Sequence, residues 1–356
     1  MICYAIGEPE FEASNWYRDI VDGLLYEKKQ KRFTLTFLAT LSELDALTVE
    51  RDDFVFVIGN DSEWISETTA KLSERFGSRV IVLGNHERRY HGTYSVVTSD
   101  ISSNVKLLCE YLISLGKKHI VMYGINPASV SDSYKADVFR SVMGEGAQLV
   151  YNDGSLSGCF ESFERVTPVA DAVICVNVYA AISLLGHLNG RSIYVTALGT
   201  GLLAEFIKPS VTHVESDYRA FAAAGLELAR LLVKNESISS LTVYIKGRFK
   251  AGESTECSPY HNNASLSPSG ATRGDTRFYS DPEVMEMLAI EEMLSHLGRD
   301  DMDMITDILD GKTYQAIADE RFISEGTVKY KMKMLCDICA VSGRAELVAL
   351  LSKYLK

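Results

Sequence analysis

Hydroxyl and ammonium side chains recur near the C-terminus at a spacing that suits contacts with nucleic acid. They are Thr327, Lys329, Lys331 and Lys333. A helix from Glu325 to about Asp337 would carry them on its outward side, after a shorter helix over 313–320 and a turn over 321–324. The Ser324 hydroxyl can cap this second helix, whose positive first turn also favours the carboxylate of Glu325. The pattern predicts a helix-turn-helix motif, whose second helix presents what the major groove of DNA requires.

An apolar spacing accompanies these polar positions. The side chains available for burial between the two helices are Ile317, Ala318, Phe322, Ile323, Val328, Met332 and Leu335. We expect them to form the shared core that fixes the angle between the helices. The candidate DNA-binding set consists of Thr313, Ser324, Glu325, Thr327, Lys329, Tyr330, Lys331 and Lys333. Double-stranded DNA is therefore the expected partner.

The charge of the chain is unevenly divided. The net charge is −12, but residues 297–356 carry nine Lys/Arg and ten Asp/Glu, which leaves a balance of only −1 there. The acidity therefore belongs mainly to the larger part of the chain. Because exposed charges are screened over about 8 Å at physiological salt, a local basic stripe can act despite a distant acidic excess.

The C-terminal segment resembles the LuxR/GerE-type DNA-binding domain from Leu297 to about Leu351. The matching positions are Asp310-Gly311-Lys312, Ile317-Ala318, Phe322-Ile323-Ser324-Glu325, Thr327-Val328-Lys329 and Ala345-Glu346-Leu347-Val348. Three features depart from the family pattern. Lys331 stands where that family most often has His, Gly326 weakens the first helical turn, and the opening over 297–301 has drifted. A degenerate domain that contacts only protein is the alternative.

The first 250 residues alternate between buried-strand and helix patterns. Apolar runs typical of strands lie at 1–6, 33–39, 54–58, 80–83, 120–123, 172–176 and 193–198. Helical patterns lie between them at 16–29, 64–76, 103–115, 134–143, 179–188 and 217–234. This alternation predicts an α/β fold with two lobes, each an open parallel sheet covered by helices. Ligands of such sheets bind beyond the carboxyl ends of the strands.

Particular stretches in this region resemble the effector domain of lactose-repressor-type regulators, which has the periplasmic-binding-protein type I fold. They are Val97-Thr98-Ser99-Asp100, 107–120, 131–143, 171–177, 208–214 and 218–232. The resemblance implies a first lobe of 1–117 and 215–236 and a second lobe of 119–213 and 240–250. It also implies three crossings between lobes, near 117–119, 213–215 and 236–240. The N-terminal DNA-binding headpiece of that family is missing, and the C-terminal helical domain stands in its place.

The same resemblance implies a small-molecule effector site between the lobes. Its candidate residues are Ser14, Asn15, Trp16, Asp100, Lys135, Asn177 and Thr200. Three of them have structural alternatives: Asn177 as the cap of a helix over 179–188, Lys135 as an ordinary exposed helix lysine, and Trp16 as a core residue. Gly199 and Thr200 occupy the place of the acidic residue that closes the sugar site in relatives, so the sequence does not identify the effector.

Composition and cysteine usage place the chain among globular proteins of a reducing compartment. It is 46% apolar and 24% charged, with no apolar run of about 18 residues and no cleavable leader, so we expect a cytoplasmic protein. The seven cysteines show no framework spacing, and Cys336 and Cys339 are better explained as core residues than as a metal or redox pair. Because no enzyme motif is present, we expect neither catalysis nor a cofactor or metal.

Residues 251–280 are rich in Ser, Thr, Gly, Pro and Asn and predict a flexible linker. A connecting helix over 281–296 follows, capped by Asp281 with Pro282 at its first position. Its broad apolar face must be buried against the DNA-binding domain (297–356), the sensor or a second subunit. The sequence therefore predicts a bacterial transcription regulator that acts as a homodimer, as both resembled families do. The alternative is a ligand-binding or scaffold protein whose C-terminal domain contacts protein partners.

Overall fold

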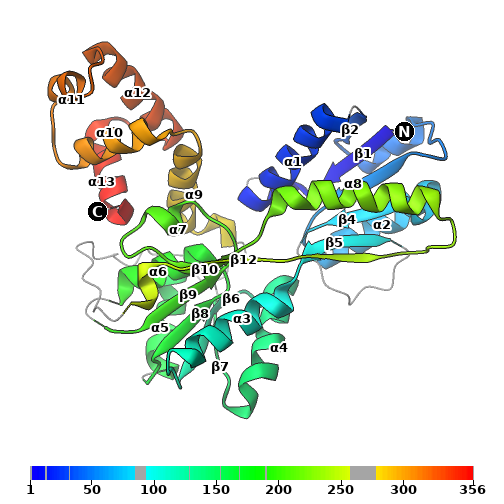
Figure 1. Cartoon of the computed structure of the whole chain (residues 1–356), viewed down its shortest axis with the longest axis horizontal. Coiled ribbons are helices and arrows are strands. Elements are labelled where there is room, and N and C mark those ends of the chain that lie inside the picture. The colour runs from blue at the N-terminus through cyan, green and yellow to red at the C-terminus, as the bar shows by residue number, and fades with distance from the viewer. Residues whose placement is uncertain are drawn as a thin grey trace. The chain divides into compact units, whose positions relative to one another are not determined.

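The computed structural model describes residues 2–12, 14–31, 33–84, 94–127, 129–152, 154–167, 169–188, 191–256 and 278–355. These residues form a mixed α/β fold with two six-stranded sheets, together with a C-terminal group of helices (Figure 1). This is the fold class that the sequence predicts.

The first sheet has the strand order β11-β5-β4-β3-β1-β2. Its strands are β1 (Ile2–Gly7), β2 (Thr34–Leu38), β3 (Phe54–Ile58), β4 (Val80–Leu83), β5 (Ser95–Ser99) and β11 (Thr242–Ile245). All of its neighbouring strands pair in parallel. Parallel strands covered on both faces need continuous apolar runs, and the fully buried Phe54–Ile58 run shows why this strand could be predicted.

The second sheet repeats that order as β12-β10-β9-β8-β6-β7. Its strands are β6 (Ile120–Ile125), β7 (Gln148–Tyr151), β8 (Ala172–Cys175), β9 (Tyr194–Leu198), β10 (Thr212–Glu215) and β12 (Arg248–Lys250). The central strands β6, β8 and β9 pair in parallel. The short strands β5, β7, β10, β11 and β12 are absent from the predicted set because polar residues interrupt their apolar runs.

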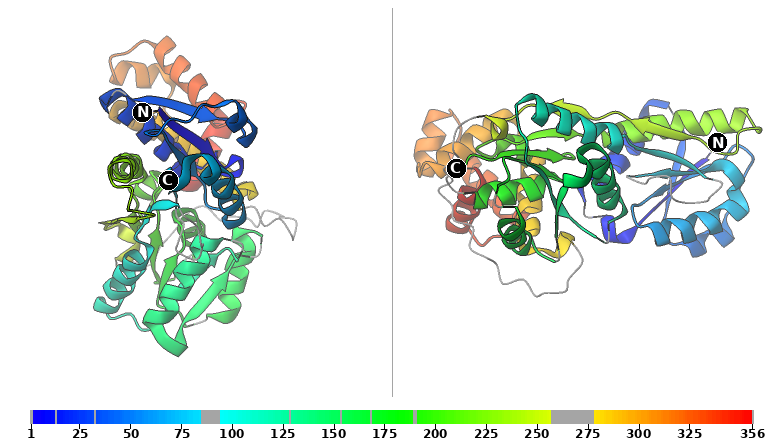
Figure 2. Two further views of the ribbon diagram at one scale, coloured as in Figure 1. Left: turned by 90° about the vertical axis from the view of Figure 1, so that its right-hand side faces the viewer. Right: turned by 90° about the horizontal axis from the view of Figure 1, so that it is seen from below.

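Helices follow most strands of both sheets. Their bounds are α1 (Asn15–Lys31), α2 (Ser62–Phe76), α3 (Ile101–Ser114), α4 (Val130–Met143), α5 (Leu156–Val166), α6 (Val178–His187), α7 (Leu203–Phe206) and α8 (Tyr218–Lys234). Helices α1 and α8 pack against each other on one face of the first sheet, and α2 covers the other face. Figure 1 and the right-hand view of Figure 2 show α8 (yellow-green) running along this sheet. The two faces separate alternate residues of β3, with Phe56 packed on one side and Val57 on the other.

Six short 3₁₀ helices complete the local structure of the described residues. They are η1 (Pro9–Phe11), η2 (Leu41–Ala46), η3 (Gly77–Arg79), η4 (Gly144–Gly146), η5 (Glu253–Thr255) and η6 (Phe278–Ser280). The C-terminal helices are α9 (Pro282–Ser295), α10 (Arg299–Leu309), α11 (Tyr314–Glu320), α12 (Glu325–Ile338) and α13 (Arg344–Leu355).

The chain forms two compact units. One consists of Met1–Tyr111, Ile125–Ala147 and Val214–Phe249, and the other of Leu112–Gly124, Gln148–His213 and Lys250–Lys356. The first contains the whole first sheet. The second joins most of the second sheet to the C-terminal helices, and in Figure 1 α9 lies beside α6 and α7.

Two details differ from the sequence-based boundaries. Strand β11 pairs with β5 in the first sheet, so 242–245 does not belong to the second lobe, where the resemblance had put 240–250. Residues 251–256, expected in the linker, pack against β10: the Ser254 Oγ accepts a hydrogen bond from Thr212 N at 2.8 Å. Residues 278–280 form η6. The middle of the expected linker, 257–277, lies outside the described residues.

Candidate nucleic-acid interface and effector-site residues

Helix α11, the turn over 321–324 and helix α12 form the predicted helix-turn-helix arrangement. Thr313 caps α11 by accepting a hydrogen bond from Ala316 N at 3.2 Å, and Ser324 caps α12 by accepting one from Thr327 N at 3.0 Å. The Ser324 cap was predicted, because a cap needs only a hydroxyl three residues before the amide whose hydrogen bond it accepts. The structure adds the Thr313 cap, which was not predicted. The helix bounds agree with the predicted bounds to within one residue.

The core of this motif is smaller than the sequence predicts. Ile317, Ala318, Val328, Met332 and Leu335 are buried as expected. Phe322 and Ile323 were also expected in this core, but Phe322 is 95% exposed and Ile323 is 37% exposed. The reason is the turn itself. Phe322 adopts a left-handed φ of 54°, and Ile323 N donates to Ala318 O at 3.1 Å, so the chain reverses and directs the Phe322 ring outward.

The lysines of α12 have different environments. Lys329 is exposed and forms an ion pair with Glu325 at 3.0 Å, and Lys333 is exposed. The ammonium group of Lys331 instead binds Asp301 of α10, and its side chain is only 32% exposed. The expectation that all three lysines point outward is therefore wrong for Lys331. Tyr330 is well exposed, while the Thr327 hydroxyl lies 2.8 Å from that of Ser324.

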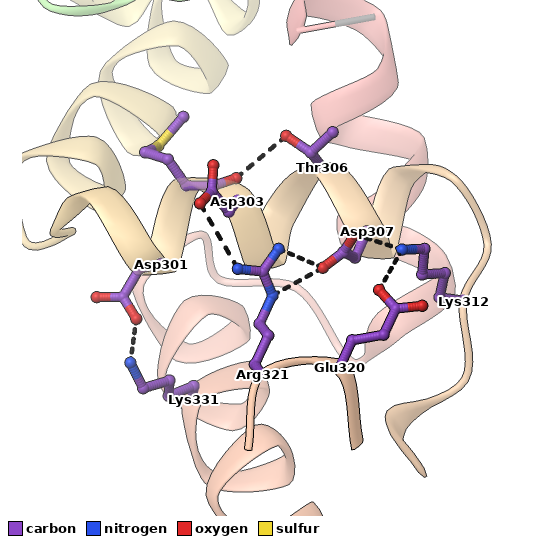
Figure 3. A network of polar contacts seen from close by, with 9 residues as sticks. Asp301, Asp303, Thr306, Asp307, Lys312, Glu320, Arg321 and Lys331 are labelled. Atoms are coloured by element: carbon purple, nitrogen blue, oxygen red, sulfur yellow. Dashed lines mark hydrogen bonds and ion pairs between the residues drawn. The ribbon is translucent and has the colours of Figure 1, made fainter. Parts of the chain in front are cut away.

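A network of ion pairs joins α10 to the start of the turn, and the sequence analysis did not anticipate it (Figure 3). Arg321 binds Asp307 through two nitrogens and approaches Asp303 at 3.6 Å. Lys312 binds both Asp307, at 2.9 Å, and Glu320, at 2.5 Å. Burial opposes ionisation of Asp307, but hydrogen bonds from Lys312 and Arg321 outweigh it and lower the pKa of this carboxyl group. The run of aspartates over 300–310 was the available signal.

The network determines which cations of this region face outward. Asp301, Asp303 and Asp307 engage Lys331, Arg321 and Lys312, so these three cations support the packing of α10 on the motif. Lys329 and Lys333 remain as the exposed cations of α12, with Thr327 and Tyr330 beside them in sequence. This surface suits contacts with a phosphate backbone, although it is less basic than the sequence suggested.

The effector-site candidates of the first sheet follow the carboxyl ends of β1 and β5. Ser14 is buried and its hydroxyl donates to Phe11 O, while the Asn15 Oδ1 accepts from Arg18 at 2.9 Å. Trp16 packs its ring against those of Phe11, Tyr17 and Tyr218, in agreement with the alternative that it is a core residue. Asp100 follows β5, and its Oδ1 accepts from Ser103 N at 3.1 Å at the start of α3.

The remaining effector-site candidates lie near the carboxyl ends of β6, β8 and β9. Asn177 caps α6 by accepting from Ala180 N at 2.9 Å, so the capping alternative is confirmed for its Oδ1. Lys135 forms an ion pair with Asp132 at 2.9 Å and is 15% exposed, so it is not the ordinary exposed lysine of the other alternative. Thr200 is partly buried and directly follows β9 and Gly199.

Helix α9 provides buried carboxylates that the sequence analysis did not single out. Asp281 caps α9, as predicted, and its second oxygen accepts from Leu156 N at 2.8 Å. Glu291 accepts from Leu202 N and from Leu203 N, the latter at 2.8 Å. Glu283 is also buried, and this burial raises its pKa to about 7. Acidic residues on an otherwise apolar helix were the available signal.

The described cysteines are buried, and the described residues show neither a metal-binding cluster nor a membrane-spanning helix. Cys336 and Cys339 are buried, and burial raises the pKa of Cys339 to about 11, which agrees with the predicted packing role. Within the described ranges, no cluster of three or more His, Cys, Asp or Glu side chains is placed to hold a metal ion. None of the helices described combines the length and apolar character needed to span a bilayer.

Comparison with known proteins finds similar folds among solved structures. No family model and no curated protein sequence matches the chain. A structure described as the LacI family regulator CCPA from Weissella paramesenteroides with bound glucose has a TM-score of 0.56 at 17% identity, covering 72% of this chain and 99% of its own. A LacI family regulator from an Arthrobacter species in complex with lactose gives 0.54 at 17% identity, with the same coverages.

A third similar structure is described as the transcriptional regulator CelR in complex with cellobiose. It has a TM-score of 0.57 at 15% identity and covers 71% of this chain and 84% of its own. At these identities the likeness establishes the fold, which is the two-sheet fold predicted for the sensor. More than a quarter of the chain lies outside each match.

Proposed function

We propose that this protein is a DNA-binding transcription regulator whose activity a small molecule controls. One observation carries the proposal. A helix-turn-helix motif with both helices capped follows, in the same chain, a two-sheet domain whose fold is similar to that of LacI family regulators. The resemblance of 297–351 to the LuxR/GerE-type domain supports the DNA-binding part, and the sugar complexes of the structural neighbours support the effector part.

In this proposal α12 enters the major groove. Lys329 and Lys333 contact phosphates, and Thr327 and Tyr330 lie near the groove edge. Thr313, Ser324 and Glu325 position the motif through caps and a local ion pair. Lys331 has a supporting role because Asp301 already binds its ammonium group. A homodimer would place two such helices on half-sites about one helical turn apart.

The proposed effector binds between the lobes, at the carboxyl ends of the strands, where Asp100, Asn177 and Thr200 lie. The ion pair between Lys135 and Asp132 would provide a charged anchor. Gly199 and Thr200 replace the acidic residue expected in a sugar site, so we propose a small polar molecule without assigning it to the sugars.

A second candidate function is recognition of a protein partner by the C-terminal helices. Phe322, Ile323 and Tyr330 are exposed apolar or aromatic side chains close together in sequence, and Tyr330 is 71% exposed. Aromatic residues of this kind are enriched at protein interfaces. The local charge balance of −1 is also compatible with a protein partner.

Fluorescence anisotropy with labelled genomic fragments distinguishes the two functions. DNA binding by the wild type should weaken as salt rises, and Lys329→Ala and Lys333→Ala should each lower the log–log salt slope by about 0.9. Lys331→Ala is the matched control on the same helix and should keep the slope. Absence of fragment-specific binding at low salt would reject the DNA-binding function, and an equal loss for all three variants would reject the assigned contacts.

A further inference from the structure

Helix α9 has two buried sides. Its core residues are Val284, Met287, Ile290, Met293 and Leu294. They share one continuous hydrophobic cluster with residues of the second sheet and its helices and with residues of α10 to α13. The apolar residues of α9 therefore fill the space between a sensor sheet and the helix-turn-helix domain, rather than forming one stripe against a single partner.

Two carboxylates attach the ends of α9 to loops of the second sheet. At one end, the Asp281 carboxylate accepts a hydrogen bond from Leu156 N at 2.8 Å. Near the other end, the Glu291 carboxylate accepts hydrogen bonds from Leu202 N and Leu203 N. Both acidic residues are at most 5% exposed. Ten residues of helix, about 15 Å, separate them. An apolar contact alone would allow α9 to slide, whereas these directional hydrogen bonds fix its position along the axis.

The loop bound by Glu291 is the segment that follows β9. Thr200, a proposed effector-site residue, lies two residues before Leu202 in this segment. A Cβ atom on Gly201 would lie 2.7 Å from Val178 and 3.7 Å from the Glu291 carboxylate, so the segment approaches both α6 and α9 closely. A displacement of this loop by a bound molecule would therefore act directly on the Glu291 hydrogen bonds.

The opposite side of α9 is attached to the C-terminal helices. Glu286 receives hydrogen bonds from Lys353 Nζ at 2.5 Å and from the Tyr354 hydroxyl at 2.9 Å, both on α13. The Cys339 thiol at the end of α12 contacts Ala289 O at 3.9 Å. Helix α12, which is proposed to read DNA, thus packs on the same helix that holds the β9 loop.

We propose that α9 couples the loop after β9 to the helix-turn-helix domain, with Glu291 as the positioning residue that senses this loop. The output of the coupling rests on the proposed DNA-binding function, but the mechanical link does not. We call the hydrogen bonds from Leu202 N and Leu203 N to Glu291 the Glu291 clamp. A displacement of Gly199–Leu203 alters this clamp and shifts α9, and α12 and α13 move with α9 because they pack against it. The domain is then held on the second sheet by α9.

Hydrogen exchange on the full chain tests the link without an effector or DNA. Glu291→Ala should accelerate amide exchange roughly tenfold or more in peptides covering 201–206, because the Leu202 and Leu203 amides lose their acceptor. Peptides covering 282–295 should also exchange faster, because α9 loses one of its attachments to the second sheet. Glu292→Ala is the matched control on the same helix: the Glu292 carboxylate forms an ion pair with His296, four residues away, and this variant should exchange like the wild type. Glu291→Gln keeps one acceptor oxygen and should give an intermediate increase in the exchange rate. This variant replaces Glu291→Ala in the test if the Ala variant does not fold.

Two results would overturn the clamp: unchanged exchange of α9 in Glu291→Ala, or equal acceleration in the first sheet. DNA anisotropy then tests the output. Glu291→Ala should change DNA affinity roughly threefold or more, and Glu292→Ala should not. If the wild type binds no fragment, the proposed function fails while the exchange result still decides the clamp. If DNA affinity is unchanged although α9 is released, α9 is a docking helix and the coupling is rejected.

Discussion

The two sheets have the same strand order, yet they satisfy the amides of the loops at their carboxyl ends in different ways. In the first unit, Glu8 follows β1 and accepts hydrogen bonds from Asn60 N at 2.8 Å and Asp61 N at 3.0 Å, in the loop after β3. In the second unit, Glu291 of α9 accepts from Leu202 and Leu203 in the loop after β9. One sheet uses a carboxylate of its own strand–helix connection, and the other uses a carboxylate from a distant helix.

This difference gives the two similar sheets different roles. The Glu8 carboxylate connects two loops of its own unit and therefore stabilises that unit. A carboxylate on α9 makes the local order of the β9 loop depend on whether the C-terminal helices are attached. The cost of leaving buried amides unpaired supplies the energetic coupling. An added segment can thus become part of an existing fold by supplying hydrogen-bond acceptors as well as apolar surface.

The largest expected effect comes from the apolar part of the attachment. Ile290→Ala removes a fully buried side chain from the cluster shared by α9 and the second sheet and should lower the free energy of unfolding of that unit by about 2–4 kcal/mol. Calorimetry should show a lower transition for this unit and an unchanged one for the first sheet. Met285→Ala, at a position that is 57% exposed, should change stability by less than about 0.5 kcal/mol. Equal effects of the two variants would contradict the burial of α9.

The stability of the second unit should depend on pH through Glu283. Burial raises the pKa of Glu283 to about 7; the Ser183 hydroxyl opposes this, the Asp281 charge adds to it, Lys353 opposes it and Glu286 adds to it. Because the pKa of Glu283 in the folded protein lies above the unfolded value of 4.5, protonation of Glu283 stabilises the folded state. This contribution is fully present below about pH 4.5 and is lost as the pH rises to about 7.

Between pH 5 and pH 7.5 the loss should be about 2.4 kcal/mol, from 1.36 kcal/mol for each pKa unit. Denaturant titrations of the second unit at pH 5 and pH 7.5 measure it, and Glu283→Gln should remove most of the difference. If Glu283→Gln keeps the full pH dependence, another group is responsible.

Removing the internal carboxylate should have a smaller and purely local effect. Glu8→Ala leaves the amides of Asn60 and Asp61 without their acceptor and should destabilise the first unit by about 1–3 kcal/mol. Exchange of α9 should not respond, in contrast to Glu291→Ala. An accelerated exchange of α9 in Glu8→Ala would mean that the two carboxylates are not independent.

The smallest expected effects come from two equivalent caps. Asp61 caps α2 after β3, and Asn177 caps α6 after β8, each by accepting an amide hydrogen bond three residues on, at 2.8 and 2.9 Å. Replacing either residue with Ala should cost about 1 kcal/mol, measured by thermal unfolding. A normal melting temperature for Asn177→Ala alone would contradict its capping role and favour direct contact with an effector.

Much of the fold follows from short stretches of sequence. The apolar runs of β3, β4 and β9 predict buried parallel strands because every residue in them must avoid water. The caps at Ser324 and Asp281 were predicted because each depends on an amide two or three residues away. The helix-turn-helix bounds follow for the same reason. The small-molecule site, the dimer and the DNA contacts remain predictions from resemblance.

Contacts between residues that are far apart in sequence were determined only by the tertiary structure. Lys331 looked like an outward lysine until packing of α10 placed Asp301 beside it, thirty residues away. Phe322 looked like core until the left-handed turn directed it into solvent. Glu291 meets its loop across 88 residues, and nothing near position 291 specifies that partner. Local patterns determine where helices and strands begin, because caps and periodicity act within one turn, whereas the partner of a buried charge depends on which segments the completed fold brings together.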